Sequence, residues 1–72
     1  MKNTRLIEAR RAAGLTQVEV ANKAGITDVC YQRYEAGQRI PRVDVAIKIA
    51  LAVNDTVENL FRQEYHKPNR TR

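Results

Sequence analysis

The chain has 72 residues, 43% of them hydrophobic, a size that suits one domain with a single core. The net charge of +5 suggests a polyanionic partner, but the last eleven residues hold four Lys or Arg against one Glu, which leaves only +2 for residues 1–61. One cysteine, one histidine and the absence of a long apolar run predict no disulfide framework, no metal or cofactor site and no membrane partner.

The first predicted helix spans residues 4–13, where apolar residues recur at helical spacing. Leu6 and Ile7 are followed by Ala9 and then by two further alanines. Gly14 comes directly after them, and a glycine at this place commonly ends a helix. We therefore expect a short amphipathic helix that ends before residue 14.

The second predicted helix runs from Gln17 to about Ala24. Thr16 and Glu19 stand in the S/T-x-x-E pattern of a capping box, in which the hydroxyl accepts from the third helical amide and the carboxylate accepts from the amide of the cap. Gly25 can end this helix at low cost because glycine readily adopts a positive φ. The inward-facing residues are predicted to be Val20, Ala21 and Ala24.

The third predicted helix, over about residues 27–36, begins directly after this glycine turn. Thr27 suits the capping position, and the carboxylate of Asp28 complements the positive end of the helix dipole. Tyr31 and Tyr34, three residues apart, are predicted to face the core. The outward residues are then Asp28, Val29, Gln32, Arg33 and Ala36.

A basic loop at residues 38–42 precedes two further predicted helices. The fourth runs from residue 42 or 43 to residue 53, with Asn54 as its left-handed end. Thr56 caps a short fifth helix, whose apolar residues are Val57, Leu60 and Phe61. We expect residues 1–65 to form the domain and residues 66–72 to be a disordered basic tail.

Together these residues resemble the helix-turn-helix family of phage Cro and CI repressors and xenobiotic-response-element regulators. The resemblance covers residues 4–61 and is densest at Gln17, Ala21, Gly25 and the apolar residues at 26, 31 and 34. Other matching positions are Arg10, Leu15, Thr16, Arg33, Glu35, Gly37, Pro41, Ile49, Ala50, Val53, Leu60 and Phe61. The resemblance implies an all-α, compact five-helix, lambda-repressor-like DNA-binding domain whose second and third helices form the helix-turn-helix.

The resemblance also implies that the third helix enters the major groove of double-stranded DNA. The expected base contacts are Asp28, Val29, Gln32 and Arg33. Arg33 can pair with guanine O6 and N7, Gln32 with adenine N6 and N7, and Val29 can contact a thymine methyl group. Asp28 either accepts from cytosine N4 or only supports the helix cap. In an arbitrary helix, Gln32 and Arg33 would instead be ordinary solvated residues.

Residues around the motif receive roles from the same resemblance. Backbone phosphates are expected to bind Gln17, Thr27, Gln38, Arg39 and Arg42. Arg10 and Glu35 occupy positions that form a structural ion pair in the family, and this pair ties the first helix to the end of the third.

The fourth helix is apolar on nearly every side, and a helix of this kind has to bury a second face. Leu51 occupies a position that is often Lys or Arg in related proteins. We therefore expect a homodimer whose two-fold contact is formed by Val45, Ile47, Leu51, Arg62 and Tyr65.

These features predict a sequence-specific transcriptional regulator that binds DNA as a dimeric repressor. A phage or mobile-element repressor, a restriction–modification controller and an antitoxin all fit a chain of this length. The alternative is a protein-interaction module, antitoxin-like or partner-binding, with weak or nonspecific DNA binding. No enzymatic activity is expected, because no catalytic constellation is present. No small-molecule ligand is expected either, since no separate ligand-sensing domain is predicted. The expected location is the cytoplasm, in association with the nucleoid.

Overall fold

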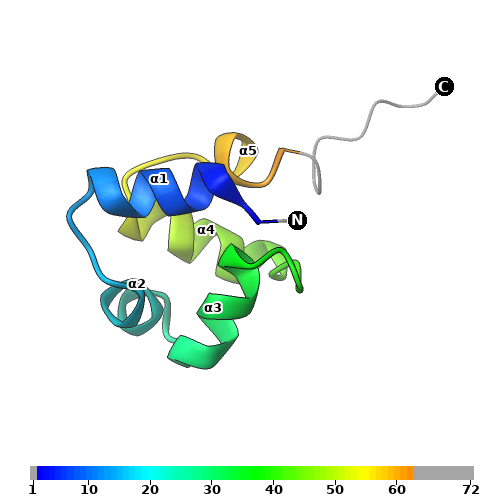
Figure 1. Cartoon of the computed structure of the whole chain (residues 1–72). Coiled ribbons are helices and arrows are strands. Elements are labelled where there is room, and N and C mark those ends of the chain that lie inside the picture. Colours follow the sequence, from blue (N-terminus) through cyan, green and yellow to red (C-terminus); the bar gives the residue numbers. More distant parts are fainter. Residues whose placement is uncertain (1, 63–72) are drawn as a thin grey trace, which may run out of the picture.

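Five α-helices follow one another in the computed structural model, which describes residues 2–62. They are α1 (Thr4–Ala12), α2 (Gln17–Ala24), α3 (Asp28–Glu35), α4 (Val43–Ala52) and α5 (Val57–Leu60). In the view of Figure 1, α1 and α5 lie on one side of the molecule, α2 and α3 on the opposite side, and α4 between them. The predicted all-α, five-helix fold is confirmed, and the predicted bounds of the first four helices agree within one residue. The predicted tail at residues 66–72 lies outside the described residues.

The starts of α2 and α3 are fixed by the predicted caps. The Thr16 hydroxyl accepts from the Glu19 amide at 3.1 Å, and the Glu19 carboxylate accepts from the Thr16 amide at 2.8 Å, which completes the capping box. The Thr27 hydroxyl accepts from the Cys30 amide at 3.1 Å. Gly25 has a φ of 72°, as expected for the residue that ends α2.

The start of α1 is fixed by Asn3, which the sequence did not single out as a cap. Its Oδ1 accepts from the Leu6 amide at 3.1 Å, while its Nδ2 donates to the Leu60 carbonyl oxygen at 2.9 Å. Its backbone amide donates to the Glu35 carbonyl oxygen at 2.9 Å. One residue therefore connects the start of α1 with the ends of α3 and α5.

The core lies where the inward faces of all five helices meet. α2 packs against α3 and α4, and α1 packs against α3 and α5. Tyr31 and Tyr34 are buried, as predicted, and so are the three inward residues of α2. The largest fully buried side chains are Tyr31, Phe61, Leu6, Ile49, Leu60 and Val20. This packing holds one side of α3 inside the domain and leaves the opposite side in solvent. None of the helices described for residues 2–62 is long and apolar enough to cross a membrane.

Candidate nucleic-acid interface

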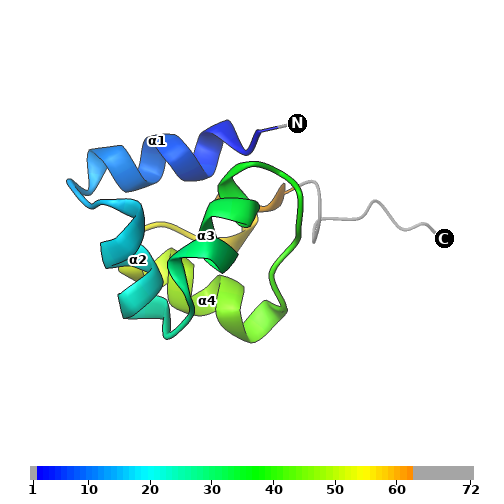
Figure 2. The same cartoon turned by 60° about the horizontal axis from the view of Figure 1, so that its bottom comes forward.

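The solvent-facing side of α3 brings the four predicted base-contact residues together. Asp28, Val29, Gln32 and Arg33 are all exposed, and we call them the outer face of α3. Val29 is apolar but 53% exposed. Figure 2 shows α3 joined to α2 by a short turn, which begins at Gly25, the residue that ends α2.

The turn between α2 and α3 sets the direction in which the outer face points. The Ile26 amide donates to the Ala21 carbonyl oxygen at 3.0 Å, and the Ile26 side chain packs, partly buried, against the core. A left-handed Gly25 followed by an inward Ile26 closes the end of α2 and redirects the chain. As a result, α3 is held against α2 by both its backbone connection and its buried side chains.

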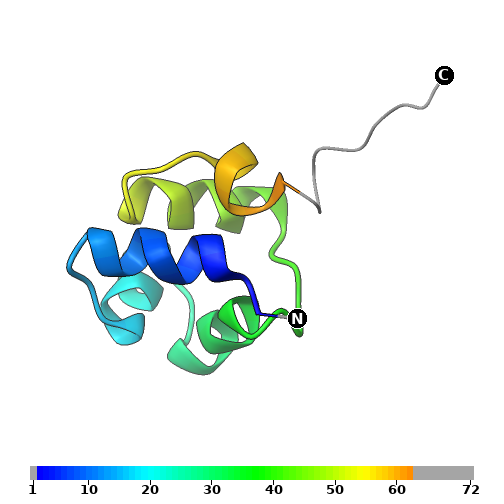
Figure 3. The ribbon, with the colours of Figure 1, turned by 45° about the horizontal axis from the view of Figure 1, so that its top comes forward.

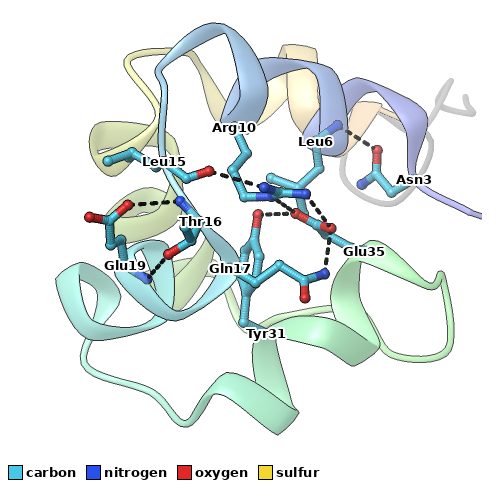
Figure 4. Close-up of polar contacts among 9 residues, drawn as sticks. All are labelled: Asn3, Leu6, Arg10, Leu15, Thr16, Gln17, Glu19, Tyr31 and Glu35. Atoms are coloured by element: carbon cyan, nitrogen blue, oxygen red, sulfur yellow. Dashed lines mark hydrogen bonds and ion pairs between the residues drawn. The ribbon is translucent and has the colours of Figure 1, made fainter.

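A buried carboxylate, Glu35, joins α1, α2 and α3 beside this face (Figure 4). Arg10 Nε lies 2.6 Å from Glu35 Oε2, and Gln17 Nε2 donates to Glu35 Oε1 at 2.9 Å. The Tyr31 hydroxyl donates to Oε2 at 2.6 Å. Arg10 also donates from Nη1 to the Leu15 carbonyl oxygen at 3.0 Å. The ion pair that the resemblance implied is thus present and is part of a larger network.

The charge of Glu35 is stabilised by its donors. Burial alone would raise the pKa of the Glu35 carboxyl. Hydrogen bonds from Arg10, Tyr31 and Gln17, together with the positive charge of Arg10, outweigh this effect, so the pKa is lowered. Burial and the hydrogen bond to Glu35 raise the pKa of the Tyr31 hydroxyl above its ordinary value. Glu35 is therefore an ionised acceptor and Tyr31 a neutral donor.

The network contains two contacts that sequence reasoning missed. Tyr31 was expected to be a core aromatic and is buried, but its hydroxyl also binds Glu35. The spacing of four residues on one helix is the signal that could have revealed this pair. Gln17, expected to bind a phosphate, uses one amide hydrogen for Glu35, so the second amide hydrogen is the one left for DNA.

Four of the predicted phosphate contacts lie before or after α3: Thr27 precedes the helix, and Gln38, Arg39 and Arg42 lie in the segment between α3 and α4. Thr27 caps the start of the helix, and its hydroxyl can still donate while it accepts from the Cys30 amide. Gln38 and Arg39 are exposed in the loop that follows α3. The Arg42 side chain is 88% exposed, and its Nε lies 3.8 Å from Asp44 Oδ1.

The residues predicted for dimerisation do not all lie together. Ile47 and Leu51 are one turn apart on the solvent side of α4, and Leu51 is 75% exposed. Val43, which is 54% exposed, extends this apolar stripe by one turn. Val45 instead packs, partly buried, against the core, and Tyr65 lies outside the described residues.

Comparison with known proteins agrees with this geometry. A helix-turn-helix family model matches residues 6–54. The chain is 34% identical over 56 residues to the cryptic phage CTXphi transcriptional repressor RstR of Vibrio cholerae, in a match that covers 78% of this chain and 50% of the relative. It is 37% identical over 68 residues to the HTH-type transcriptional regulator ImmR of Bacillus subtilis, in a match that covers 93% of this chain and 54% of the relative. The chain thus spans about half the length of these two relatives.

A solved structure is similar over most of both chains. The restriction–modification controller protein C.AhdI from Aeromonas hydrophila is 32% identical to this chain, with a TM-score of 0.75. The superposition covers 82% of this chain and 89% of the controller protein.

Proposed function

The chain belongs to the helix-turn-helix family of Cro and CI type, and from this membership we propose that it is a transcriptional regulator that binds double-stranded DNA sequence-specifically. The observation that supports the proposal most directly is the outer face of α3. Four exposed side chains lie side by side on a helix whose opposite side is locked into the core. α3 lies in the major groove in this proposal, with these side chains at the base edges.

The chemistry of the outer face suits recognition of a mixed base sequence. The Arg33 guanidinium can donate to both guanine O6 and N7, and the Gln32 amide can pair with adenine. Val29 offers an apolar contact for a thymine methyl group. The phosphate contacts then set the position of α3 on the duplex, and they are Gln17, Thr27, Gln38, Arg39 and Arg42.

We further propose that the protein is a repressor and acts as a homodimer. RstR, to which it is similar, is a transcriptional repressor. The exposed stripe of Val43, Ile47 and Leu51 supplies the contact between two copies, which would place two α3 helices about 34 Å apart on a pseudo-palindromic site. Such a protein works in the cytoplasm, in association with the nucleoid.

The test begins with selection of binding sites from a random DNA pool. Arg33→Ala should then lose about 1–3 kcal/mol of binding free energy on the selected site and relax the preference at one base pair. Its control is Arg39→Ala, which should weaken binding to all sequences alike, because a phosphate contact carries no base information. Both variants are compared by fluorescence anisotropy on selected and scrambled duplexes.

The same measurement separates this function from a protein-interaction module. Equal affinity of the wild-type protein for selected and random DNA, lost in both cases as salt rises, would rule out the specific regulator. Equal loss by Arg33→Ala on both duplexes would remove Arg33 from the set of base contacts.

A further inference from the structure

A recess of about 340 Å³ lies at one end of the molecule. Three segments that are distant in sequence form it: the start of α1, the loop after α3 and the end of α5. Figure 3 shows these segments near the N-terminal end of the described chain. Each segment contributes basic side chains, and the four that line the recess are Lys2, Arg5, Arg39 and Arg62.

The four basic side chains of this recess have no acidic counterpart in it. No Asp or Glu is among its lining residues in the described part of the chain, residues 2–62. Arg5 donates from Nη1 to Oδ1 of Asn59 at 3.2 Å, which is a neutral acceptor. Neither the Arg10–Glu35 ion pair nor the Arg42–Asp44 ion pair involves the recess. Cations gathered in this way attract a polyanion.

The recess is continuous with the proposed DNA surface through Lys2. Lys2 also lines a second, more open depression, whose other residues include Gln17, Gln32 and Arg33. A DNA backbone that flanks α3 therefore has a path past Lys2 into the basic recess. All four basic side chains are exposed, so they suit a backbone that passes over the surface better than a small buried ligand.

We propose that this recess binds phosphates of the DNA backbone in addition to those contacted by the helix-turn-helix. This inference rests on the proposed function, and it adds Lys2, Arg5 and Arg62 to the DNA surface. Arg62, which the sequence placed in a dimer contact, takes a different role here. Each phosphate neutralised by a cation releases condensed counterions, so the added contacts raise affinity without adding base preference and make binding more sensitive to salt.

The test compares two double variants that remove the same charge. Lys2→Gln with Arg62→Gln alters the recess but keeps Arg5 and its bond to Asn59. Lys23→Gln with Lys48→Gln alters two exposed lysines, on α2 and α4, that do not line the recess. The slope of log affinity against log salt should become shallower by about 0.9 for each lost phosphate contact in the recess variant only. The selected base sequence should stay the same.

A phosphate-by-phosphate experiment then locates the contact. Single methylphosphonate substitutions, which neutralise one DNA phosphate at a time, should identify positions that weaken the wild-type protein but not the recess variant. Circular dichroism confirms that both variants are folded.

Three results would overturn the proposal that the recess binds DNA phosphates. The first is an equal slope of log affinity against log salt for the two double variants. The second is the absence of any phosphate position that distinguishes the recess variant from the wild type. The third is binding of inorganic pyrophosphate by the wild type together with an unchanged slope for DNA in the recess variant. The slopes are also measured on random DNA. Failure to select a specific site would therefore overturn the proposed function, while the slopes would still test whether the recess binds phosphates.

Discussion

At the scale of single residues, Glu35 joins three helices through its carboxylate. It is only 4% exposed, yet it is ionised, because side chains from three helices donate to its two oxygen atoms. A buried charge of this kind stabilises a protein only while its partners are in place, and removal of one partner leaves an uncompensated charge. The network also holds Gln17, the first residue of α2, in the position from which it is proposed to contact DNA.

Stability should therefore depend on pH through Glu35. Its pKa in the folded protein lies below the ordinary value of 4.5, so its stabilising effect is complete above that value and is lost as pH falls through the lowered folded pKa. Urea unfolding should show Glu35→Gln to be less stable than the wild type by about 3–5 kcal/mol near neutral pH. The difference should shrink in strong acid.

The control for this experiment is Glu8→Gln, an exposed position on α1, whose pH profile should parallel that of the wild type. A constant difference between Glu35→Gln and the wild type across the whole pH range would contradict the role given to the Glu35 charge.

Only some of the contacts in the Glu35 network could be predicted from the sequence. Arg10 and Glu35 could be paired because the family resemblance supplied the pairing. The hydrogen bond between Gln17 and Glu35 could not be predicted, because it depends on the angle at which α2 and α3 cross, and no local sequence pattern encodes that angle. Tyr31 was predicted to face the core on the basis of its aromatic ring alone, and no partner was predicted for its hydroxyl, which binds Glu35.

At the scale of helices and turns, the backbone at Gly25 decides how α2 meets α3. A Cβ added at Gly25 would meet nothing within 4 Å, so the cost of a substitution there comes from its φ of 72° alone. Gly25→Ala should lose about 1 kcal/mol of unfolding free energy. Gly25→Asn should lose less, because Asn tolerates the left-handed region. Thermal denaturation of the two variants provides the measurement.

Gly14 offers a matched control for the turn. It has a φ of 73° and equally open surroundings, but it lies between α1 and α2, outside the helix-turn-helix. Gly14→Ala should therefore cost about as much as Gly25→Ala. If Gly25→Asn were as destabilising as Gly25→Ala, backbone conformation would not be the cause.

The elements themselves were predictable where short-range chemistry defines them. Thr16 with Glu19, Thr27 and Gly25 fix the ends of α2 and the start of α3, and all act as their local sequence indicated. The orientation of α4 was harder to predict, because a helix that is apolar on nearly every side has no polar face to show which side is buried. Val45 was grouped with Ile47 and Leu51 for this reason, whereas the structure packs it against the core.

At the scale of the whole molecule, the exposed stripe on α4 predicts assembly. Leu51 is 75% exposed and lies one turn from Ile47, so burial of this stripe removes apolar area from water. Leu51→Glu should convert a dimer into a monomer, as measured by sedimentation equilibrium. It should also weaken binding to a site with two half-sites far more than binding to a single half-site.

Val18→Glu is a suitable control for assembly, since Val18 is 50% exposed on α2 and lies outside the stripe. Its molecular mass in solution should equal that of the wild type. An identical mass for Leu51→Glu and the wild type would contradict the proposed dimer contact.

The position of Asn3 has a consequence for how the protein is made. Its side chain donates to the carbonyl oxygen of Leu60, a residue 57 positions later in the chain. On the ribosome, residue 3 emerges long before residue 60 is added, so α1 leaves the exit tunnel before the carbonyl oxygen to which the Asn3 side chain donates has been made. The domain therefore completes its fold only after nearly the whole described segment has been synthesised, and a stalled nascent chain that lacks α5 should remain open to proteases.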